Sequence, residues 1–215
     1  MAGRFCRLEP LDAARHADDL FEAYAADRTG ALWTYMADGP YLSADAFRAA
    51  MESAAVSTDA VYYAIVERGS GKPAGRAAYL RIGPQAGSIE IGSIAFAPSL
   101  QRTPAATEAM YLMLVRVFDE LGYRRCEWKC DALNEPSRRA AERLGFTYEG
   151  LFRQALVYKG RNRDTAWYAM IDRDWPAIRR GFESWFDPAN FDTDGGQKVS
   201  LATFIAAAIA AEQGP

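Results

Sequence analysis

Residues 134–150 read NEPSRRAAERLGFTYEG, a pattern that predicts a capped helix, a glycine stop and a strand. Asn134 suits the N-cap because its side-chain oxygen can accept a backbone N–H from the first turn. Gly145 suits the position after the helix because glycine takes the left-handed conformation there without strain. Upstream, residues 101–109 read QRTPAATEA and open another helix directly after a strand. Two strand-to-helix junctions of this kind can form a site for an anionic cofactor between them.

The length and composition of the chain are typical of a soluble globular protein. Its 215 residues suffice for one domain with a substantial core, with or without an appendage. The net charge of -3 and the scattering of Lys and Arg among acids do not suggest a nucleic-acid partner. No stretch reaches the roughly 18 apolar residues of a membrane span. The first residues also lack the apolar region of a signal peptide, so we expect a cytoplasmic protein without a membrane partner.

The sparse histidine and cysteine residues argue against metal or triad chemistry. Cys126 and Cys130 lie in a strand-like run, on the same face as Trp128, and lack the histidine neighbours of a metal site. We expect reduced core cysteines there and at Cys6. His16, the single histidine, falls on the polar side of an early helix and is expected to be exposed. The sequence thus predicts no metal site and no Ser-His-Asp triad.

Hydrophobic periodicity and turn residues predict the other elements. The expected strands are residues 4–8, 60–67, 73–82, 88–96, 125–131, 146–158 and 164–171, and the expected helices are residues 12–26, 43–56, 104–121, 134–144 and 174–186. Residues 187–197 are rich in Asp, Gly and Pro, as in a linker, and residues 199–211 form a short alanine-rich helix. We therefore expect one domain over residues 1–186. A linker and a helix that packs on the body or on a partner subunit follow over residues 187–215.

The fourth predicted strand changes its apolar phase in the middle. Ile89 and Ile91 share one parity, whereas Ile94 and Phe96 share the other. Because side chains alternate between the faces of a strand, the reversal predicts one inserted residue at Gly92-Ser93, a β-bulge. Such a bulge would separate the strand from a neighbour and leave backbone groups free for a ligand. The alternative is a strand buried on both faces.

The order and content of these segments resemble the GNAT superfamily of acyl-CoA-dependent N-acyltransferases, in its RimJ/RimL-like branch. The resemblance covers residues 4–171, which is most of the chain. Its strongest motif is Asn134-x-x-Ser137 followed by Leu144-Gly145-Phe146 and Glu149-Gly150. The further matches are Gln101 and Ala106 at the outer positions of the family's cofactor signature, Thr107-Glu108-Ala109 after it, Glu90-Ile91-Gly92 in the preceding strand, and Arg153.

The resemblance implies an α/β (α+β) protein with the GNAT fold. Its central sheet would be mixed and mostly antiparallel, with about seven strands, helices on both faces, and splayed fourth and fifth strands. The implied activity is that of an N-acetyltransferase with acetyl-CoA (coenzyme A) as cofactor. An amine would attack the thioester directly in a ternary complex, without a covalent enzyme intermediate.

The resemblance assigns cofactor binding to a helix N-terminus, a strand and the Asn134 turn. The helix N-terminus offers N–H groups and a positive dipole end to the diphosphate of coenzyme A. Pro104 replaces the central glycine of the family signature and removes one donor, for which Arg102 and Thr103 would compensate. The alternative is a plain Thr103 cap with proline at the first helical position. The expected cofactor-binding residues are Ile94, Ala95, Phe96, Gln101, Arg102, Thr103, Pro104, Ala105, Ala106, Thr107, Asn134 and Ser137.

Three residues are the expected catalytic groups. Glu90 would accept, directly or through water, the proton that the ammonium must lose before attack; the alternative is a structural carboxylate paired with an arginine. Asn134 matches the family position near the thiol end of the cofactor, and it is also a good N-cap. Ser137 would protonate or stabilise the thiolate, since Ala141 replaces the tyrosine acid common in the family; the alternative is a surface serine. The weaker candidates for the base, on a strand face expected to be exposed, are Glu127 and Asp131.

The acceptor in this fold usually binds among the first two helices, their connection and the last strands. The aromatic residues of those segments are the expected lining, although any of them can be core: Trp33, Tyr35, Tyr41, Tyr158 and Trp167. Aromatic walls suit the primary amine of a small molecule, which is the acceptor we expect. The alternatives are a protein N-terminal (ribosomal-protein-type) acetyltransferase and a non-catalytic acyl-CoA-binding module. The branch often dimerises and the tail helix is apolar, so a homodimer is compatible with the sequence.

Overall fold

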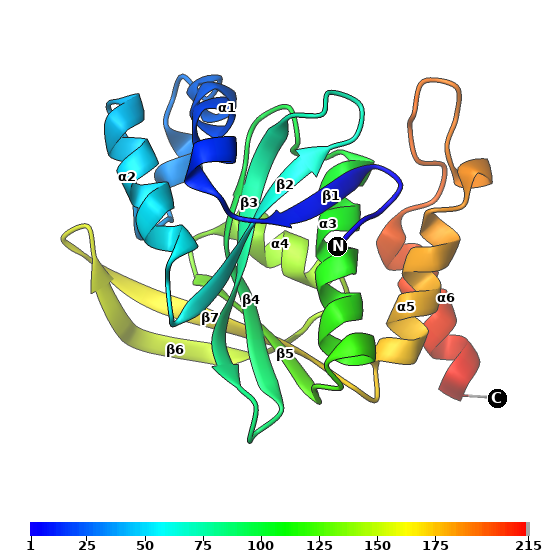
Figure 1. The fold of residues 1–215 in the computed structure, drawn as a ribbon. Coiled ribbons are helices and arrows are strands. Elements are labelled where there is room, and N and C mark those ends of the chain that lie inside the picture. The colour runs from blue at the N-terminus through cyan, green and yellow to red at the C-terminus, as the bar shows by residue number, and fades with distance from the viewer. Residues whose placement is uncertain (214–215) are drawn as a thin grey trace. The chain divides into compact units, whose positions relative to one another are not determined.

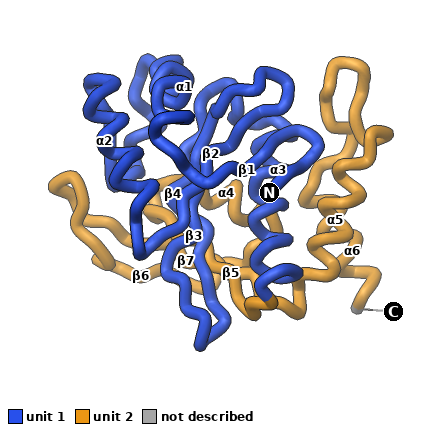
Figure 2. The backbone as a smooth tube through the Cα atoms, in the orientation of Figure 1, with its two compact units in different colours: residues 1–121 blue, residues 122–215 orange. Residues whose placement is uncertain are grey.

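The computed structural model describes residues 1–213, which fall into two compact units (Figure 2). The first unit is Met1–Leu121 and the second is Gly122–Pro215, of which residues 214 and 215 lie outside the described part. Seven strands are divided between the units, in the order β1-β2-β3-β4 in the first and β5-β7-β6 in the second. The strand pairs inside each unit are antiparallel.

The first unit is a four-stranded meander with a helix pair inserted after its first strand (Figure 1). Its elements are β1 (Cys6–Pro10), α1 (Ala13–Ala25), the 3-10 helix η1 (Ala31–Trp33), α2 (Ala44–Ala55), β2 (Ala60–Glu67), β3 (Pro73–Gly83), β4 (Ser88–Phe96), α3 (Pro104–Val115) and the π-helical turn η2 (Arg116–Glu120). The first two helices begin where the sequence supplies caps. Asp12 accepts the N–H of Ala14, and Ser43 accepts that of Ala46.

Helices cover both faces of this meander, as the alternating side chains of β3 show. Arg76 points toward α2, where its Nη1 lies 3.7 Å from the Sδ of Met51. Tyr79, on the opposite face, donates its hydroxyl to the Met113 carbonyl of α3 at 2.8 Å. Since α1 packs beside α2, these two helices lie on one face and α3 lies on the other.

The phase reversal predicted in β4 is confirmed as a β-bulge. The register between β3 and β4 moves from Ala78 opposite Gly92 to Arg76 opposite Ala95. Two residues of β4, Ser93-Ile94, therefore face a single residue of β3. Ser93 has a φ of 50°, in the left-handed region that side chains other than glycine seldom adopt. A regular strand would have kept one apolar phase throughout.

Glu108 of α3 fixes the beginning of the chain against this helix. Its carboxylate accepts the backbone N–H groups of Arg4 at 2.7 Å, Phe5 at 2.6 Å and Cys6 at 2.8 Å. Hydrogen bonds to an ionised acceptor are stronger than neutral ones, so these three hold β1 in place. Burial, with Glu108 as a neighbour, raises the pKa of the Cys6 thiol far above its ordinary value. Cys6 is thus a neutral, reduced core residue, as expected.

The second unit is a three-stranded sheet with α4 on one face. Its elements are β5 (Arg125–Asp131), α4 (Glu135–Arg143), β6 (Thr147–Tyr158), β7 (Arg161–Ile171), α5 (Trp175–Trp185), the 3-10 helix η3 (Pro188–Asn190) and α6 (Leu201–Gln213). Trp128 of β5 donates its Nε1–H to Ser137 Oγ at 3.0 Å, and Arg138 Nε donates to the Tyr168 hydroxyl of β7 at 3.2 Å. Trp128 and Tyr168 are opposite each other in the register, so both leave the sheet toward α4.

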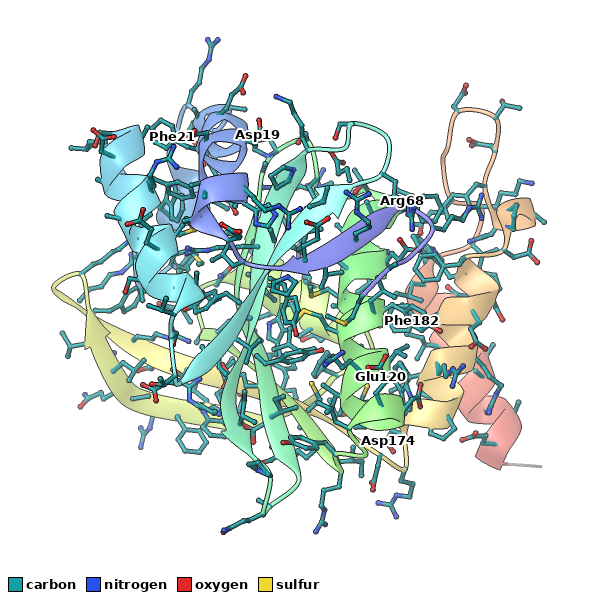
Figure 3. The ribbon with its side chains drawn as sticks, in the orientation of Figure 1. Asp19, Phe21, Arg68, Glu120, Asp174 and Phe182 are labelled. Carbon is teal, nitrogen blue, oxygen red and sulfur yellow. The ribbon has the colours of Figure 1, made fainter. Side chains whose placement is uncertain are left out.

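The C-terminal helix α6 packs along α5 (Figure 1). Phe182, marked on α5 in Figure 3, is fully buried, as are Leu201 and nearly all of Ile205 on α6. Gly181 permits the close approach of the two helices, because a Cβ at this position would lie 2.7 Å from the Cα of Ile205. The tail helix therefore packs against the second unit of its own chain.

The Gly181→Ala variant is expected to lower the free energy of unfolding by about 1–2 kcal/mol, since the added methyl group pushes against the backbone of α6. The gain in helix propensity, about 1 kcal/mol, is already subtracted in this figure. Urea unfolding followed by tryptophan fluorescence would measure the difference. Gly69→Ala is the matched control, because nothing lies within 4 Å of a Cβ at Gly69. Equal stability of the two variants would show that α6 does not depend on this contact.

The predicted strands and helices are confirmed, with small shifts at their ends. The helix predicted over residues 104–121 is α-helical only to Val115, after which the chain widens into a π-helical turn. The strand predicted from residue 164 begins earlier, at Arg161, because it continues the hairpin with β6. The predicted linker contains the short helix η3 and an isolated bridge between Phe191 and Gln197.

The prediction of an exposed His16 is wrong, since this side chain is only 2% exposed. The backbone N–H of Asp12 donates to His16 Nδ1 at 3.1 Å, and the carboxylate of Glu9 lies 3.4 Å from Nε2. Both ring nitrogens therefore have polar partners, which offset the free-energy cost of burying the imidazole.

The predicted exposed face of β5 is also wrong. Asp131 is 3% exposed, and its carboxylate accepts the Tyr158 hydroxyl at 2.7 Å and the Leu133 N–H at 2.9 Å. Glu127 is mostly covered and forms ion pairs with Arg125 and Lys129. The alternation of apolar and charged residues correctly separated the two faces of the strand. It could not show that ion pairs within β5 and the Tyr158 hydroxyl of β6 cover the charged face.

Candidate functional site

The first turn of α3 lies directly after β4 in the first unit. Thr103 caps it: its Oγ1 accepts the N–H of Ala106 at 3.2 Å and donates to the Leu100 carbonyl at 2.7 Å. Pro104 occupies the first helical position, where an N–H would have no acceptor within the helix. Arg102 is exposed and has a φ of 63°. The turn thus combines a threonine cap, a proline at the first helical position, small residues and an exposed guanidinium.

Gln101 connects this turn to the end of β4. Its side-chain Nε2 donates to the carbonyl of Phe96 at 2.9 Å, and its backbone N–H donates to the carbonyl of Ala97. The structure therefore gives Gln101 a role in shaping the loop between strand and helix. The first turn and the bulged strand belong to the same compact unit, so this loop sets their spacing.

The bulge places two residues of β4 outside the ladder with β3. Ser93 and Ile94 have no partner in that register, and both are half-buried. Ala95 and Phe96 follow at the end of the strand, with Ala95 fully buried. The carbonyls of Ala95 and Phe96 already accept the Tyr24 hydroxyl and the Gln101 side chain. The backbone groups of Ser93 and Ile94, which the ladder with β3 skips, are the kind that a ligand can pair with.

Glu90 is buried next to the bulge. Its side chain is 3% exposed, and one carboxylate oxygen accepts Nη1 of Arg81 at 2.7 Å. The other oxygen lies 3.1 Å from the position that a Cβ on Gly92 would take. The arginine partner that a structural role of Glu90 requires is therefore present. In this ion pair the Glu90 carboxylate lies beside Gly92, directly before the bulge.

Two of the expected acceptor-lining residues lie in one aromatic cluster of the first unit. The Trp33 ring is 5.3 Å from that of Tyr41 and 5.5 Å from that of Tyr24, both edge-on. Phe47 of α2 closes the cluster, at 5.2 Å from Tyr41. Tyr35 is half-buried in the same segment. Edge-on packing of this kind makes a rigid aromatic wall.

A buried ion pair beneath this wall is the feature that sequence reasoning missed. Arg76 of β3 binds Asp38, and Tyr41 donates its hydroxyl to the same carboxylate at 2.8 Å. The guanidinium also lies 5.8 Å from the Trp33 ring. An arginine inside the apolar run PAGRAAYL was the available signal, since such a residue is seldom buried without a partner.

The pKa values of this cluster reflect the pairing. Burial would raise the pKa of the Asp38 carboxyl, but Arg76 and Tyr41 outweigh burial and hold that pKa below its ordinary value. Burial and the bond to Asp38 raise the pKa of Tyr41 to about 12. At neutral pH the carboxylate is therefore charged and the phenol is neutral.

The Asp38→Asn variant is expected to be less stable than wild type at pH 7, because it leaves the Arg76 charge buried without a counter-ion. A folded-state pKa below the unfolded value of about 4 contributes stability above pH 4, and this stability disappears as pH falls through the folded pKa. The difference in unfolding free energy should therefore narrow between about pH 5 and pH 3. Urea unfolding at several pH values measures it.

Asp18→Asn is the matched control, because this exposed carboxylate pairs only with Arg48 of α2 at the surface. It should change stability by less than about 0.5 kcal/mol at pH 7. A difference for Asp38→Asn that stays constant down to pH 3 would mean that the Asp38 charge does not stabilise the fold.

In the second unit, Asn134 and Ser137 form the first turn of α4. Asn134 is the N-cap, and its Oδ1 accepts the N–H of Ser137 at 3.2 Å. Ser137 is half-buried, and its Oγ accepts the Nε1–H of Trp128. Burial raises the pKa of the Cys130 thiol, although a hydrogen bond from Ser137 opposes this. The hydroxyl thus lies between an indole and a sulfur atom.

The other two expected acceptor-lining residues lie on the hairpin of β6 and β7. Tyr158 donates its hydroxyl to Asp131 and accepts Nη2 of Arg161 at 2.8 Å. Trp167 stacks on Phe152 with ring centres 4.4 Å apart, and Nζ of Lys129 lies 3.8 Å from its ring centre. The structure therefore separates the five aromatic candidates into a first-unit group and a second-unit pair.

Within residues 1–213, no group of three or more His, Cys, Asp and Glu side chains has the arrangement of a metal site. Over the same residues, none of the helices has both the length and the apolar content needed to cross a membrane.

Comparisons with known proteins identify the family. A family model described as "Acetyltransferase (GNAT) domain" matches residues 6–147. The crystal structure of a GCN5-related N-acetyltransferase from Brucella melitensis is 47% identical, with a TM-score of 0.93 over 95% of this chain and 93% of that one. A GNAT-family structure from Chromobacterium violaceum ATCC 12472 is 42% identical, with a TM-score of 0.76 over 81% of this chain and 87% of that one.

A curated relative supports the RimJ/RimL-like branch that the sequence predicts. YdaF of Bacillus subtilis (strain 168), provisionally named a ribosomal N-acetyltransferase, is 33% identical over 69 residues. The match spans 32% of this chain and 38% of the length of that relative. The predicted fold, with seven strands in a mixed and mostly antiparallel arrangement, is confirmed by the structural similarity. The chain therefore belongs to the GNAT superfamily of acetyl-CoA-dependent acetyltransferases.

Proposed function

We propose that this chain transfers an acetyl group from acetyl-CoA to the primary amine of a small molecule, by direct attack in a ternary complex. The observation that carries the proposal is the β4 bulge, which leaves Ser93 and Ile94 outside the ladder beside the first turn of α3. Membership of the GNAT superfamily supports the reaction class. The acceptor and the roles of single residues are inferred from the contacts described above.

The residues present fit coenzyme A in spite of Pro104. Ala105 and Ala106 put no bulk in the first turn of α3, and the exposed Arg102 can bind phosphate oxygens. Proline costs the turn one donor, but at a position where the helix itself has no use for it. The backbone of Ser93 and Ile94, which lies outside the ladder with β3 and next to Ala95 and Phe96, can bind the amide groups of the pantetheine arm. Thr103, which is the N-cap, and Thr107 complete this end of the helix.

Bound acetyl-CoA supplies an acetyl thioester, which a neutral amine attacks so that coenzyme A leaves as the thiol. Glu90 is the proposed base. An alkylammonium with a pKa near 10 must lose a proton before attack, and a carboxylate can accept it directly or through water. The position of Glu90 beside Gly92 brings this carboxylate next to the bulge. Its pairing with Arg81 keeps the side chain in one orientation.

Ser137 is the proposed proton donor to the leaving sulfur. Its Oγ accepts the Trp128 Nε1–H, and its single proton is directed at the sulfur of Cys130. For donation to the leaving sulfur, the hydroxyl would turn from Cys130 to the cofactor. Asn134 holds the turn through its Oδ1 and keeps its amide N–H groups for the cofactor. In this way the chain can dispense with the family tyrosine that Ala141 replaces.

The aromatic wall of Trp33 and Tyr41 supports a small acceptor with an apolar side. A second candidate is acetylation of a protein N-terminus, which the name of YdaF favours. The proposed small-molecule acceptor rests on the ion pair of Asp38 and Arg76 beneath the wall. A buried, specific polar pair is better suited to a compact ligand than to a variable peptide chain.

Thiol release from acetyl-CoA tests the proposal. The panel would contain free amino acids, amino-acid esters, aralkylamines and diamines, together with octapeptides with a free N-terminal amine. Acetylated products would be confirmed by mass spectrometry. Turnover with a small amine and not with peptides is the expected result. Turnover with peptides alone would establish the second candidate. Binding of acetyl-CoA without turnover on any amine would point to a non-catalytic module.

A further inference from the structure

The Arg76 guanidinium has more donors than its surroundings accept. The side chain is 2% exposed and is the largest fully buried one among the described residues. Nη2 binds Asp38, Nη1 lies 3.7 Å from the thioether of Met51, and the guanidinium also has a hydrogen bond with the Tyr41 side chain, but Nε has no partner among residues 1–213. A guanidinium carries five N–H donors, and thioethers are weak acceptors. Buried donors without acceptors are costly in free energy, so an acceptor that is not part of this chain would account for the arrangement.

The position of Arg76 connects it to the proposed acetyl-transfer site. Arg76 lies opposite Ala95, directly after the bulge, and Leu80 lies opposite Glu90, two residues before Gly92 at the start of the bulge. Residues 76, 78 and 80 share one face of β3, the face covered by α1 and α2. Ala78, opposite Gly92, is two residues from each, which is roughly 7 Å along the strand. An amine held at the bulge is therefore within reach of both the Glu90 carboxylate and the Arg76 guanidinium.

Asp38 marks the direction from which the guanidinium can be reached. Its side chain is 35% exposed, whereas Arg76 behind it is buried. It binds Arg76 through one nitrogen only, which leaves the planar fork of the guanidinium open to a bidentate partner. The Tyr41 hydroxyl and the Trp33 ring flank the same spot.

We infer that Arg76 binds a carboxylate of the acceptor, so that the substrate is a primary amine that also bears a carboxylate, such as a free amino acid. The carboxylate shares the guanidinium with Asp38 and takes its unused donors, and the apolar part of the substrate lies against Trp33 and Tyr41. This inference rests on the proposed function and adds the class of the substrate. A protein N-terminus has a neutral amide where a free amino acid has its α-carboxylate, and this amide would not pair with the charge of Arg76.

The test compares each free amino acid with its methyl ester, in which the carboxylate is masked and the amine is kept. The readout is kcat/KM from thiol release with saturating acetyl-CoA. We expect at least one amino acid to exceed its ester by about tenfold or more, as found when a site built for a polar group meets an analogue that lacks it. Arg76→Lys, which keeps the charge but loses the fork, should raise KM for the amino acid with little change in kcat and bring the ratio toward one.

Arg48→Met, which removes an exposed arginine of α2, is the control and should leave the ratio unchanged. Calorimetric binding of acetyl-CoA shows whether each variant is folded. Esters and simple amines that react as well as amino acids would overturn the inference while keeping the proposed function. An Arg76→Lys effect equal on acid and ester, or confined to kcat, would make Arg76 structural and overturn it as well. No turnover on any small amine would overturn the inference and the proposed function together.

Discussion

The Glu90→Gln variant is expected to lose about 100-fold or more in kcat for acetyl transfer while binding acetyl-CoA as wild type does. The amide is close in shape to the carboxylate and keeps an oxygen for Arg81, but it cannot accept a proton. Removal of a general base commonly costs between 10²-fold and 10⁴-fold in rate. Steady-state thiol release measures kcat, and isothermal titration with acetyl-CoA measures the affinity. A rate that recovers at higher pH, where more of the amine is neutral, would agree with this role.

Two further variants separate chemistry from structure. Glu120→Gln removes an exposed carboxylate on η2 (Figure 3), whose partner is Arg116, and should leave kcat unchanged. Arg81→Met removes the ion-pair partner of Glu90 but leaves the carboxylate, so turnover should fall far less than in Glu90→Gln. If Arg81→Met and Glu90→Gln lose activity equally, Glu90 acts only as the structural partner of Arg81, and another base must be sought.

The Glu108→Ala variant is expected to lower the free energy of unfolding by about 3 kcal/mol, because three backbone donors lose their acceptor. Glu108 accepts the N–H groups of Arg4, Phe5 and Cys6, and the variant removes all three of these hydrogen bonds at once. Cys6 is fully buried, so its N–H cannot turn to water instead. Urea or thermal unfolding would measure the loss.

Glu52→Ala is the matched control for Glu108→Ala, since Glu52 is an exposed residue of α2 and should change stability by less than about 0.5 kcal/mol. Protection of the Cys6 amide against hydrogen exchange gives a local readout. It should be lost selectively in Glu108→Ala if the carboxylate anchors β1. Wild-type stability with unchanged exchange at Cys6 would mean that the packing of α3 on β1 suffices without the carboxylate.

Local sequence patterns were sufficient for most of the fold and for part of the candidate site. The β4 bulge followed from the phase of Ile91 and Phe96 alone, because a strand has a strict period of two. The caps at Ser43, Thr103 and Asn134 followed from residue type, because a cap depends on atoms only a few positions away in the chain. Features of this kind are determined by neighbours in sequence.

The partners of buried polar residues could not be predicted in the same way. Arg76 and Asp38 meet only because the register of β3 places residue 76 under the segment before α2. The burial of His16 depends on Glu9, which belongs to a preceding strand, and that of Asp131 depends on Tyr158 from a different strand. Ser137 was predicted from its motif, but its contact with Trp128 required the packing of α4 on β5. Such pairs are long-range in sequence, so periodicity carries no information about them.

Binding of acetyl-CoA is the central claim, because every proposed role depends on it. Isothermal titration of the purified protein with acetyl-CoA, with ATP and NAD as controls, tests it most directly. The account predicts micromolar affinity for acetyl-CoA and no binding of the controls, in spite of Pro104 at the head of α3. The absence of binding at millimolar acetyl-CoA would contradict it, and would show that this chain keeps the GNAT fold without the function of its family.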